Sequence, residues 1–150
     1  MHRSAIPAPA AAVFAWHARP GAFERLTPPW SNVRVLERHG DIRPGGRVVL
    51  RMPLGPFGVR WVAEHRDYEE GRSFRDVQVS GPFARWEHTH RVDPTGPDAC
   101  TLEDRVEYEL PRGALGAAVG GRMVRALLPK LFAYRPVSYT HLTLPTTPYV

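Results

Sequence analysis

Residues 16–30, WHARPGAFERLTPPW, carry the clearest structural signal in this chain. Their apolar side chains recur at helical spacing on both sides of Pro20-Gly21, a pair that breaks a helix. Pro28-Pro29 then ends the second helical segment, because proline lacks a backbone donor. The stretch therefore predicts two short helices that meet at a sharp corner, and such a corner can shape the mouth of a cavity.

The rest of the chain is expected to form a sheet and one long helix. Strands are expected at residues 4–6, 33–38, 47–52, 59–68, 73–80, 84–92 and 100–110, separated by turns that contain glycine or proline. Between residues 115 and 134 the apolar residues recur at helical spacing, and Pro129 is expected to kink this helix. This order predicts an α+β chain with the helix-grip fold. An antiparallel sheet of about seven strands would wrap around a long C-terminal helix, with two short helices after the first strand.

The bulk composition limits the classes of function. At 150 residues the chain is long enough for one domain with a real core. A single cysteine, Cys100, excludes an internal disulfide and indicates a reducing, cytoplasmic location. Pro7 and Pro9 interrupt the region that resembles a leader peptide, and no stretch reaches the roughly 20 apolar residues that span a bilayer. The net charge is +5, but acids alternate with the cations, so we expect no nucleic-acid partner.

The last residues form a separate segment. Residues 137–147, VSYTHLTLPTT, carry no charged side chain and no amphipathic period, and the string resembles a translated sequencing adapter. We therefore expect one domain at residues 1–136, with a truncated C-terminal helix, followed by a non-native, disordered tail at residues 137–150. A genuine disordered tail is the alternative, and neither interpretation gives the tail a function.

The alternation of charges along the strands indicates which side chains face a cavity, because successive strand residues point to opposite faces. Residues 73–80 are ambiguous alone, but a hairpin around residues 81–83 would place Asp76 opposite His88. The same register would place Phe74 opposite His90 and Gln78 opposite Trp86. The residues expected to line a ligand site are Trp61, His65, Phe74, Asp76, Gln78, Trp86, His88, His90, Asp104 and Tyr108 on the strands, and Met123 and Leu127 on the helix. At the helix corner, His17 and Trp30 are expected to border the entrance.

Residues 74–90, FRDVQVSGPFARWEHTH, are similar to a signature of bacterial ligand-binding proteins of the SRPBCC superfamily, which is also called START/Bet v 1-like. Residues 16–30 and 132–135 fit the same group, so the resemblance covers residues 2–135. It implies a hydrophobic pocket between the sheet and the long helix. Members often carry names such as polyketide cyclase/dehydrase, and some are fused to an epimerase-like nucleotide-binding domain.

The polar residues on the inner face allow several kinds of chemistry. His88 and His90 can belong to a hydrogen-bonded network, Asp76 to His88 and Gln78 to Trp86 or His90. They can also contact a ligand, or bind a metal with His65 or Asp76, although two histidines on one strand are a weak metal signal. We expect no metal and no cofactor.

Catalysis is a further alternative. Asp76 and His88 can act as a general acid/base pair, with Asp104 as a second carboxylate. No activated nucleophile is evident, since Ser80 has no base nearby in the sequence and Cys100 is expected to pack as a small apolar residue.

We therefore expect a cytoplasmic protein that binds a hydrophobic small molecule, such as a lipid, an isoprenoid, a polyketide-like molecule or an aromatic compound. A cyclase or dehydratase that uses Asp76 and His88 is the first alternative. A regulatory or interaction domain that works beside an epimerase-like partner is the second.

Overall fold

The computed structural model describes residues 1–54 and 56–138. Its elements, in chain order, are β1 (His2–Ile6), α1 (Ala10–His17), α2 (Ala22–Leu26), the 3-10 turn η1 (Pro29–Ser31), β2 (Arg34–His39), β3 (Arg47–Leu54), β4 (Phe57–Glu69), β5 (Ser73–Ser80), β6 (Arg85–Gly96), β7 (Ala99–Glu109) and α3 (Ala114–Ser138). The predicted order of elements is confirmed. Most observed strands are one to four residues longer at one end than the predicted ranges.

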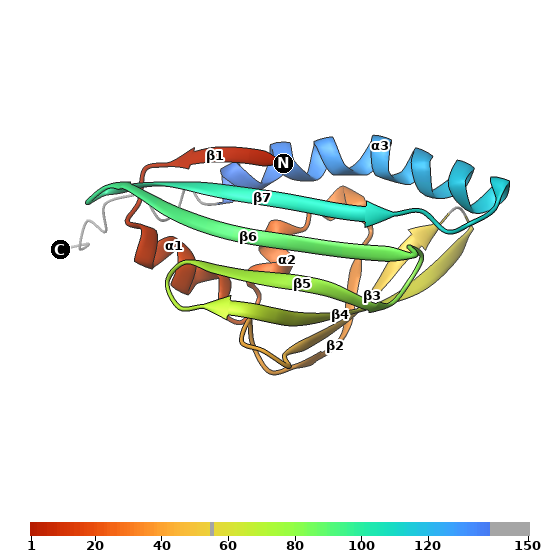
Figure 1. Cartoon of the computed structure of the whole chain (residues 1–150), viewed down its shortest axis with the longest axis horizontal. Coiled ribbons are helices and arrows are strands. Elements are labelled where there is room, and N and C mark those ends of the chain that lie inside the picture. The colour runs from red at the N-terminus through yellow and green to blue at the C-terminus, as the bar shows by residue number, and fades with distance from the viewer. Residues whose placement is uncertain (55, 139–150) are drawn as a thin grey trace.

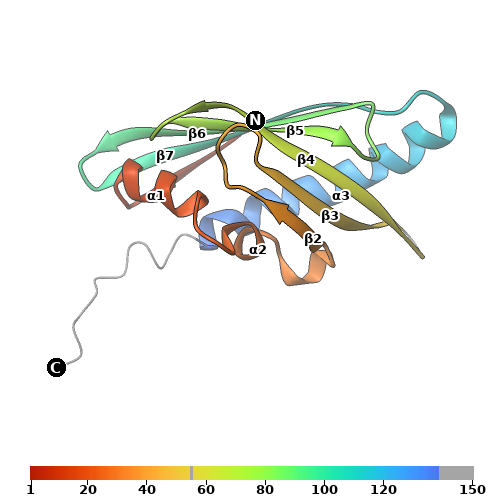
Figure 2. The same ribbon diagram turned by 90° about the horizontal axis from the view of Figure 1, so that it is seen from below.

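The seven strands form one antiparallel sheet in the order β1-β7-β6-β5-β4-β3-β2. The long helix α3 runs along the sheet (Figure 1). Seen from below, α1, α2 and α3 lie on the same side of the curved sheet (Figure 2). This is the predicted helix-grip arrangement, and it leaves space between the concave face and the helices.

The corner between α1 and α2 depends on one glycine. Gly21 precedes α2 with φ of 77°, a backbone conformation that residues with a Cβ atom rarely adopt. Thr27 follows α2, and its hydroxyl donates a hydrogen bond to the Phe23 carbonyl at 2.8 Å. Pro28 comes next in the chain, so the helix cannot continue. The two short helices predicted from residues 16–30 are therefore confirmed.

The register of the β5–β6 hairpin places the polar side chains. Asp76 lies opposite His88, and Phe74 lies opposite His90, as predicted. The paired ladder ends at Val77 and Glu87, one residue before the expected pair of Gln78 and Trp86.

The side chain of Gln78 instead forms hydrogen bonds with the turn that follows β5. Its Nε2 donates to the Phe83 carbonyl at 2.8 Å, and the Phe83 amide donates to its Oε1 at 3.3 Å. The predicted hydrogen bond from Gln78 to Trp86 or His90 is replaced by these two bonds, because the turn backbone lies closer to the amide than the facing strand does.

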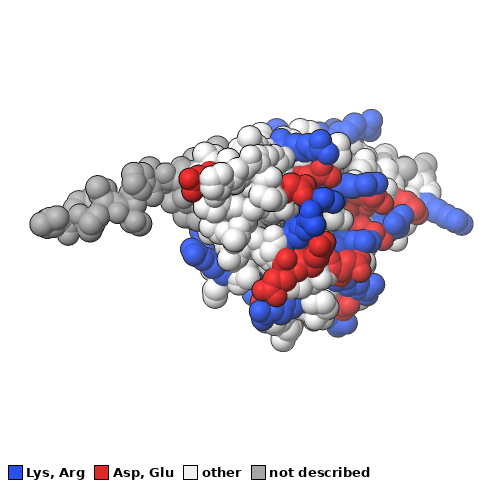
Figure 3. Space-filling model, turned by 60° about the vertical axis from the view of Figure 1, so that its left-hand side comes forward, with Lys and Arg blue, Asp and Glu red and all other residues white. Residues whose placement is uncertain are grey.

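The two sheet faces differ as the charge alternation predicted. On the outer face, Arg75 and Arg85 both pair with Glu87, at 2.9 and 3.0 Å. Positive and negative side chains are intermixed on the face shown in Figure 3. The apolar residues of the inner face pack in two clusters, one with α1 and α2 and one with Val124 of α3. Cys100 belongs to the first cluster, and burial raises the pKa of its thiol.

Tyr108 lies on the inner face, opposite Trp86, but it is more exposed than Trp86. Its side chain is 42% exposed, although its ring centroid lies 6.0 Å from that of Phe83 and 6.1 Å from that of Trp86. Tyr108 is the second-last residue of β7, where the sheet opens to solvent before the connection to α3. An amphipathic ring can keep one side on the core there and its hydroxyl in water.

Helix α3 is continuous from Ala114 to Ser138, through Pro129 and into the first two residues of the predicted tail. Residues 139–150 lie outside the described residues, so the interpretation of the tail stays a prediction. Within the described part of the chain, no helix is both long and apolar enough to cross a membrane.

Replacing Gly21 by alanine tests the corner. We expect a loss of about 1 kcal/mol of unfolding free energy, because alanine is strained at positive φ. Gly96→Ala is the matched control: no positive φ is recorded for Gly96, and a Cβ there meets no atom within 4 Å. Urea unfolding measures both, and an equal effect of the two substitutions would contradict the role of Gly21.

Candidate functional site

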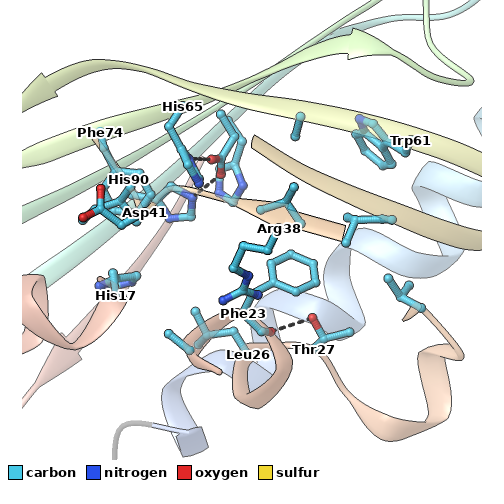
Figure 4. Close-up of a pocket in the computed structure, with 18 of the residues that line it drawn as sticks. His17, Phe23, Leu26, Thr27, Arg38, Asp41, Trp61, His65, Phe74 and His90 are labelled. Carbon is cyan, nitrogen blue, oxygen red and sulfur yellow. Dashed lines mark hydrogen bonds and ion pairs between the residues drawn. The ribbon is translucent and has the colours of Figure 1, made fainter. Parts of the chain in front are cut away.

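A cavity of about 330 Å³ lies between the concave face of the sheet and the helices. Its apolar lining includes Phe23 and Leu26 of α2, Ile42, Val48, Leu50 and Met52, Trp61, Phe74, Phe83 and Trp86 on the sheet side, and Val124 and Leu128 of α3. The lining histidines gather at one side, where Figure 4 shows His17, His65 and His90 beside Phe74, with Trp61 at the other side. The cavity therefore has a polar side and an apolar side.

The polar side is a group of five residues from four neighbouring strands, which we call the His/Asp cluster: His65, Asp76, His88, His90 and Asp104. The Asp76 carboxylate contacts His90 Nε2 at 2.9 Å and His65 Nδ1 at 2.5 Å. One oxygen of Asp104 lies 2.8 Å from His88 Nε2 and 3.1 Å from His90 Nδ1. His90 thus stands between two carboxylates.

Ring packing orients the histidines. The rings of Phe74 and His90 stack with centroids 4.4 Å apart and planes at 15°. The His88 and His90 rings are 3.9 Å apart, and the His17 ring of α1 approaches His90 at 5.8 Å. Since His88, His90 and Phe74 are all buried, packing holds the rotamers of all three, and hydrogen bonds also hold the two histidines.

Contacts within the His/Asp cluster favour the charged forms of Asp76 and His90. Burial disfavours the charged carboxylate of Asp76, but contacts with His65 and His90 outweigh it and hold its pKa well below the ordinary value. Burial likewise opposes the charged imidazole of His90, yet hydrogen bonds to Asp104 and Asp76 raise its pKa above the ordinary value. These contacts therefore favour the protonated form of His90, which lines the cavity.

The hydrogen bonds differ from the expected pairing of Asp76 with His88. These residues face one another in the ladder, but Asp76 contacts His65 and His90, and His88 contacts Asp104. Strands twist, so a side chain on a strand also reaches the diagonal position on its neighbour. An acid/base pair in direct contact is therefore Asp76 with His90.

The predicted site residues fall into three groups: those that line the cavity, those outside its lining, and those whose side chains the structure does not describe. Trp61, His65, Phe74, Asp76, Trp86, His88 and His90 line the cavity, as does His17 at the helix corner. Gln78, Asp104, Tyr108 and Trp30 are outside the lining: Asp104 lies behind the histidines at 1% exposure, and Trp30 is 49% exposed. The side chains of Met123 and Leu127 lie outside the described residues.

Arg38 is a lining residue that the sequence pattern missed. A β-bulge between Val35 and Glu37 shifts the register of β2, so the simple alternation of faces no longer applies beyond it. Arg38 therefore faces Val48 at the cavity mouth, where its Nη2 lies 3.0 Å from both carboxylate oxygens of Glu24 on α2. A bulge has no reliable signal in a single sequence.

The sheet wrapped around α3, with the cavity between sheet and helices, defines a protein of the helix-grip fold. The chain belongs to the polyketide cyclase / dehydrase and lipid transport family, whose model matches residues 6–133. Among curated proteins, no sequence matches this chain.

Solved structures agree with this fold. The Zhui aromatase/cyclase from Streptomyces sp. R1128 superimposes with a TM-score of 0.72 at 16% identity, over 95% of this chain and 91% of that one. A point mutant of norcoclaurine synthase from Thalictrum flavum, bound to a transition state analogue, gives 0.67 at 17% identity over 93% and 92%. A START superfamily protein from Mycobacterium smegmatis gives 0.57 at 20% identity over 89% and 94%. At these identities the likeness shows the fold.

Replacing His90 by glutamine tests the charge state of the cluster. The stabilisation from charged His90 is fully present below the pKa of an unfolded histidine, about 6.5, and is lost as pH rises through the raised folded-state pKa. The contribution of Asp76 is present above about pH 3.9 and is lost as pH falls through its lowered folded-state pKa.

The difference in unfolding free energy between wild type and H90Q should therefore be greatest from about pH 4 to 6.5 and shrink at higher pH. Urea unfolding at a series of pH values measures it. A difference that stays constant into the alkaline range would contradict the charged state of His90.

Proposed function

We propose that this protein binds a compact hydrophobic molecule in the cavity, with the polar group of the ligand held at the His/Asp cluster. The observation that carries the proposal is the division of one cavity into an apolar wall and a buried polar side. Small-molecule sites commonly combine apolar walls with a few convergent polar groups. The family, whose description includes lipid transport, supports the same role.

The size and lining of the cavity narrow the class of ligand. Its volume, about 330 Å³, lies at the lower end of the range for small-molecule sites, which favours a compact molecule. Trp61, Phe83 and Trp86 form an aromatic wall with ring centroids 4.9 to 5.6 Å apart. Such a wall favours a ligand with a planar ring or a short isoprenoid-like chain, since aromatic faces offer large apolar contact area.

An enzyme of the cyclase or dehydratase type is the second candidate. Its support is His90, which contacts two carboxylates and lines the cavity with a raised pKa. An imidazole held in this way can donate a proton to a bound carbonyl or hydroxyl group and take it back, with Asp76 as its partner. The pair in this proposal is Asp76 with His90.

Native mass spectrometry of the full chain tests the binding function. We expect a co-purifying small molecule, or saturable binding of an apolar fluorescent probe to the emptied protein. A well-folded protein that admits no apolar probe would overturn the proposal. Turnover of a polyketide-like substrate that is lost in H90Q, while binding persists, would favour the enzyme.

A cavity-filling substitution identifies the binding place. Ala63→Phe should abolish probe binding, because Ala63 lines the cavity and a phenyl group would occupy part of its volume. Val79→Phe is the matched control, since Val79 on β5 is 47% exposed and does not line the cavity. Probe titration measures both variants, with thermal unfolding to verify folding. Equal affinity of A63F and wild type would show that the probe binds elsewhere.

A further inference from the structure

Three side chains of the His/Asp cluster converge as ligands of one metal ion would. Asp76, His88 and His90 each offer one ligand atom, and these atoms all lie within 4.8 Å of one another. The histidines are buried and Asp76 is half-buried, so this is not a patch of exposed acids. The sequence alone favoured a hydrogen-bonded network, because two histidines on one strand are a weak metal signal and buried polar residues usually pair with one another.

We propose that the His/Asp cluster binds one divalent transition metal ion of the Zn²⁺ class, with Asp76, His88 and His90 as its ligands. This inference goes beyond the proposed function, because binding of an apolar molecule does not require a metal. Two imidazoles and one carboxylate are a known ligand set for zinc sites that keep an open coordination position.

The distances suit this ion after small side-chain rotations. Zinc bonds to nitrogen and carboxylate oxygen are about 2.0 to 2.2 Å long, which puts neighbouring ligand atoms of a tetrahedral site roughly 3.4 Å apart. His90 Nε2 and Asp76 Oδ2 are already 2.9 Å apart. The ligand atoms lie within 4.8 Å of one another, so the widest separation needs to shorten by at most about 1.4 Å to reach that spacing.

Asp104 would act as a positioning residue for the imidazoles of His88 and His90. Metal-bound histidines usually donate their second ring N–H to a carboxylate, which sets the tautomer and orients the ring. Asp104 Oδ1 lies 2.8 Å from His88 Nε2 and 3.1 Å from His90 Nδ1. With protons at those two atoms, the ligand atoms are Nδ1 of His88 and Nε2 of His90.

Charge and access also favour a divalent cation. Asp76 and Asp104 bring two carboxylates into one buried cluster, and a divalent ion would neutralise both charges. His65 contacts the other oxygen of Asp76 and would fix its orientation. Since Asp76, His88 and His90 all line the cavity, the ion would be reached through it and its open position would face the bound molecule.

Isothermal titration of the full, untagged 150-residue chain with Zn²⁺ alone tests the site. We expect one Zn²⁺ per chain, and a loss of affinity of about 10-fold or more in D76N, H88Q and H90Q. Asp104→Asn should weaken binding by roughly 10- to 100-fold and broaden the visible spectrum of bound Co²⁺, since the imidazoles lose their orientation. His39→Gln is the control, because that side chain is 70% exposed and lies outside the cluster.

Absence of Zn²⁺ binding at micromolar concentration, or binding lost in H39Q and kept in H88Q, would overturn the metal site. If the cluster variants fail to fold, nitrogen NMR of wild type decides: Zn²⁺ must shift the ring signals of His88 and His90 and leave His39 unchanged. Binding of an apolar probe, measured separately with chelator present, reports on the proposed function alone, so the two can fail independently.

Discussion

The burial of the Asp104 carboxylate is the constraint on which the inner face of the sheet depends. A carboxylate at 1% exposure is costly unless polar contacts compensate it, and here His88 hydrogen-bonds to it at 2.8 Å while His90 Nδ1 lies at ion-pair distance, 3.1 Å. Those contacts hold β6 and β7 in one register, because a shift by one residue would turn both imidazoles to the outer face. His90 then reaches Asp76 and links β5, so the cluster and the alignment of three strands depend on each other.

The cluster also explains why one side of the cavity is polar. Five titratable groups can lie beneath the helices only because each contacts another member of the group. The aromatic wall around Trp61 and Trp86 supplies the apolar remainder. A ligand entering this space would meet fixed donors and acceptors at one end and close-packed rings at the other, so its orientation would be set by the protein.

Much of this architecture follows from local patterns. Pro20-Gly21 marked the helix corner, the alternation of charges placed Trp61, Trp86 and the histidines on the inner face, and the expected hairpin placed Phe74 there. The sequence pattern did not predict contacts between side chains on different strands, such as the contact of Asp76 with His90. These contacts depend on the twist of the strands and on the side-chain rotamers. Alternation placed Tyr108 on the correct face, but it does not reveal how far the helices cover that face, so the exposure of Tyr108 could not be predicted.

The β2 bulge also matters at the border of the sheet. β2 is a terminal strand, and the outer edge of such a strand can pair with another chain. The bulge leaves Leu36 without a partner in the ladder and interrupts the regular spacing of the edge. A straight strand from a neighbouring molecule therefore cannot add to it over its full length. The irregularity that turns Arg38 toward the cavity thus also disfavours pairing of another strand along this edge of the sheet.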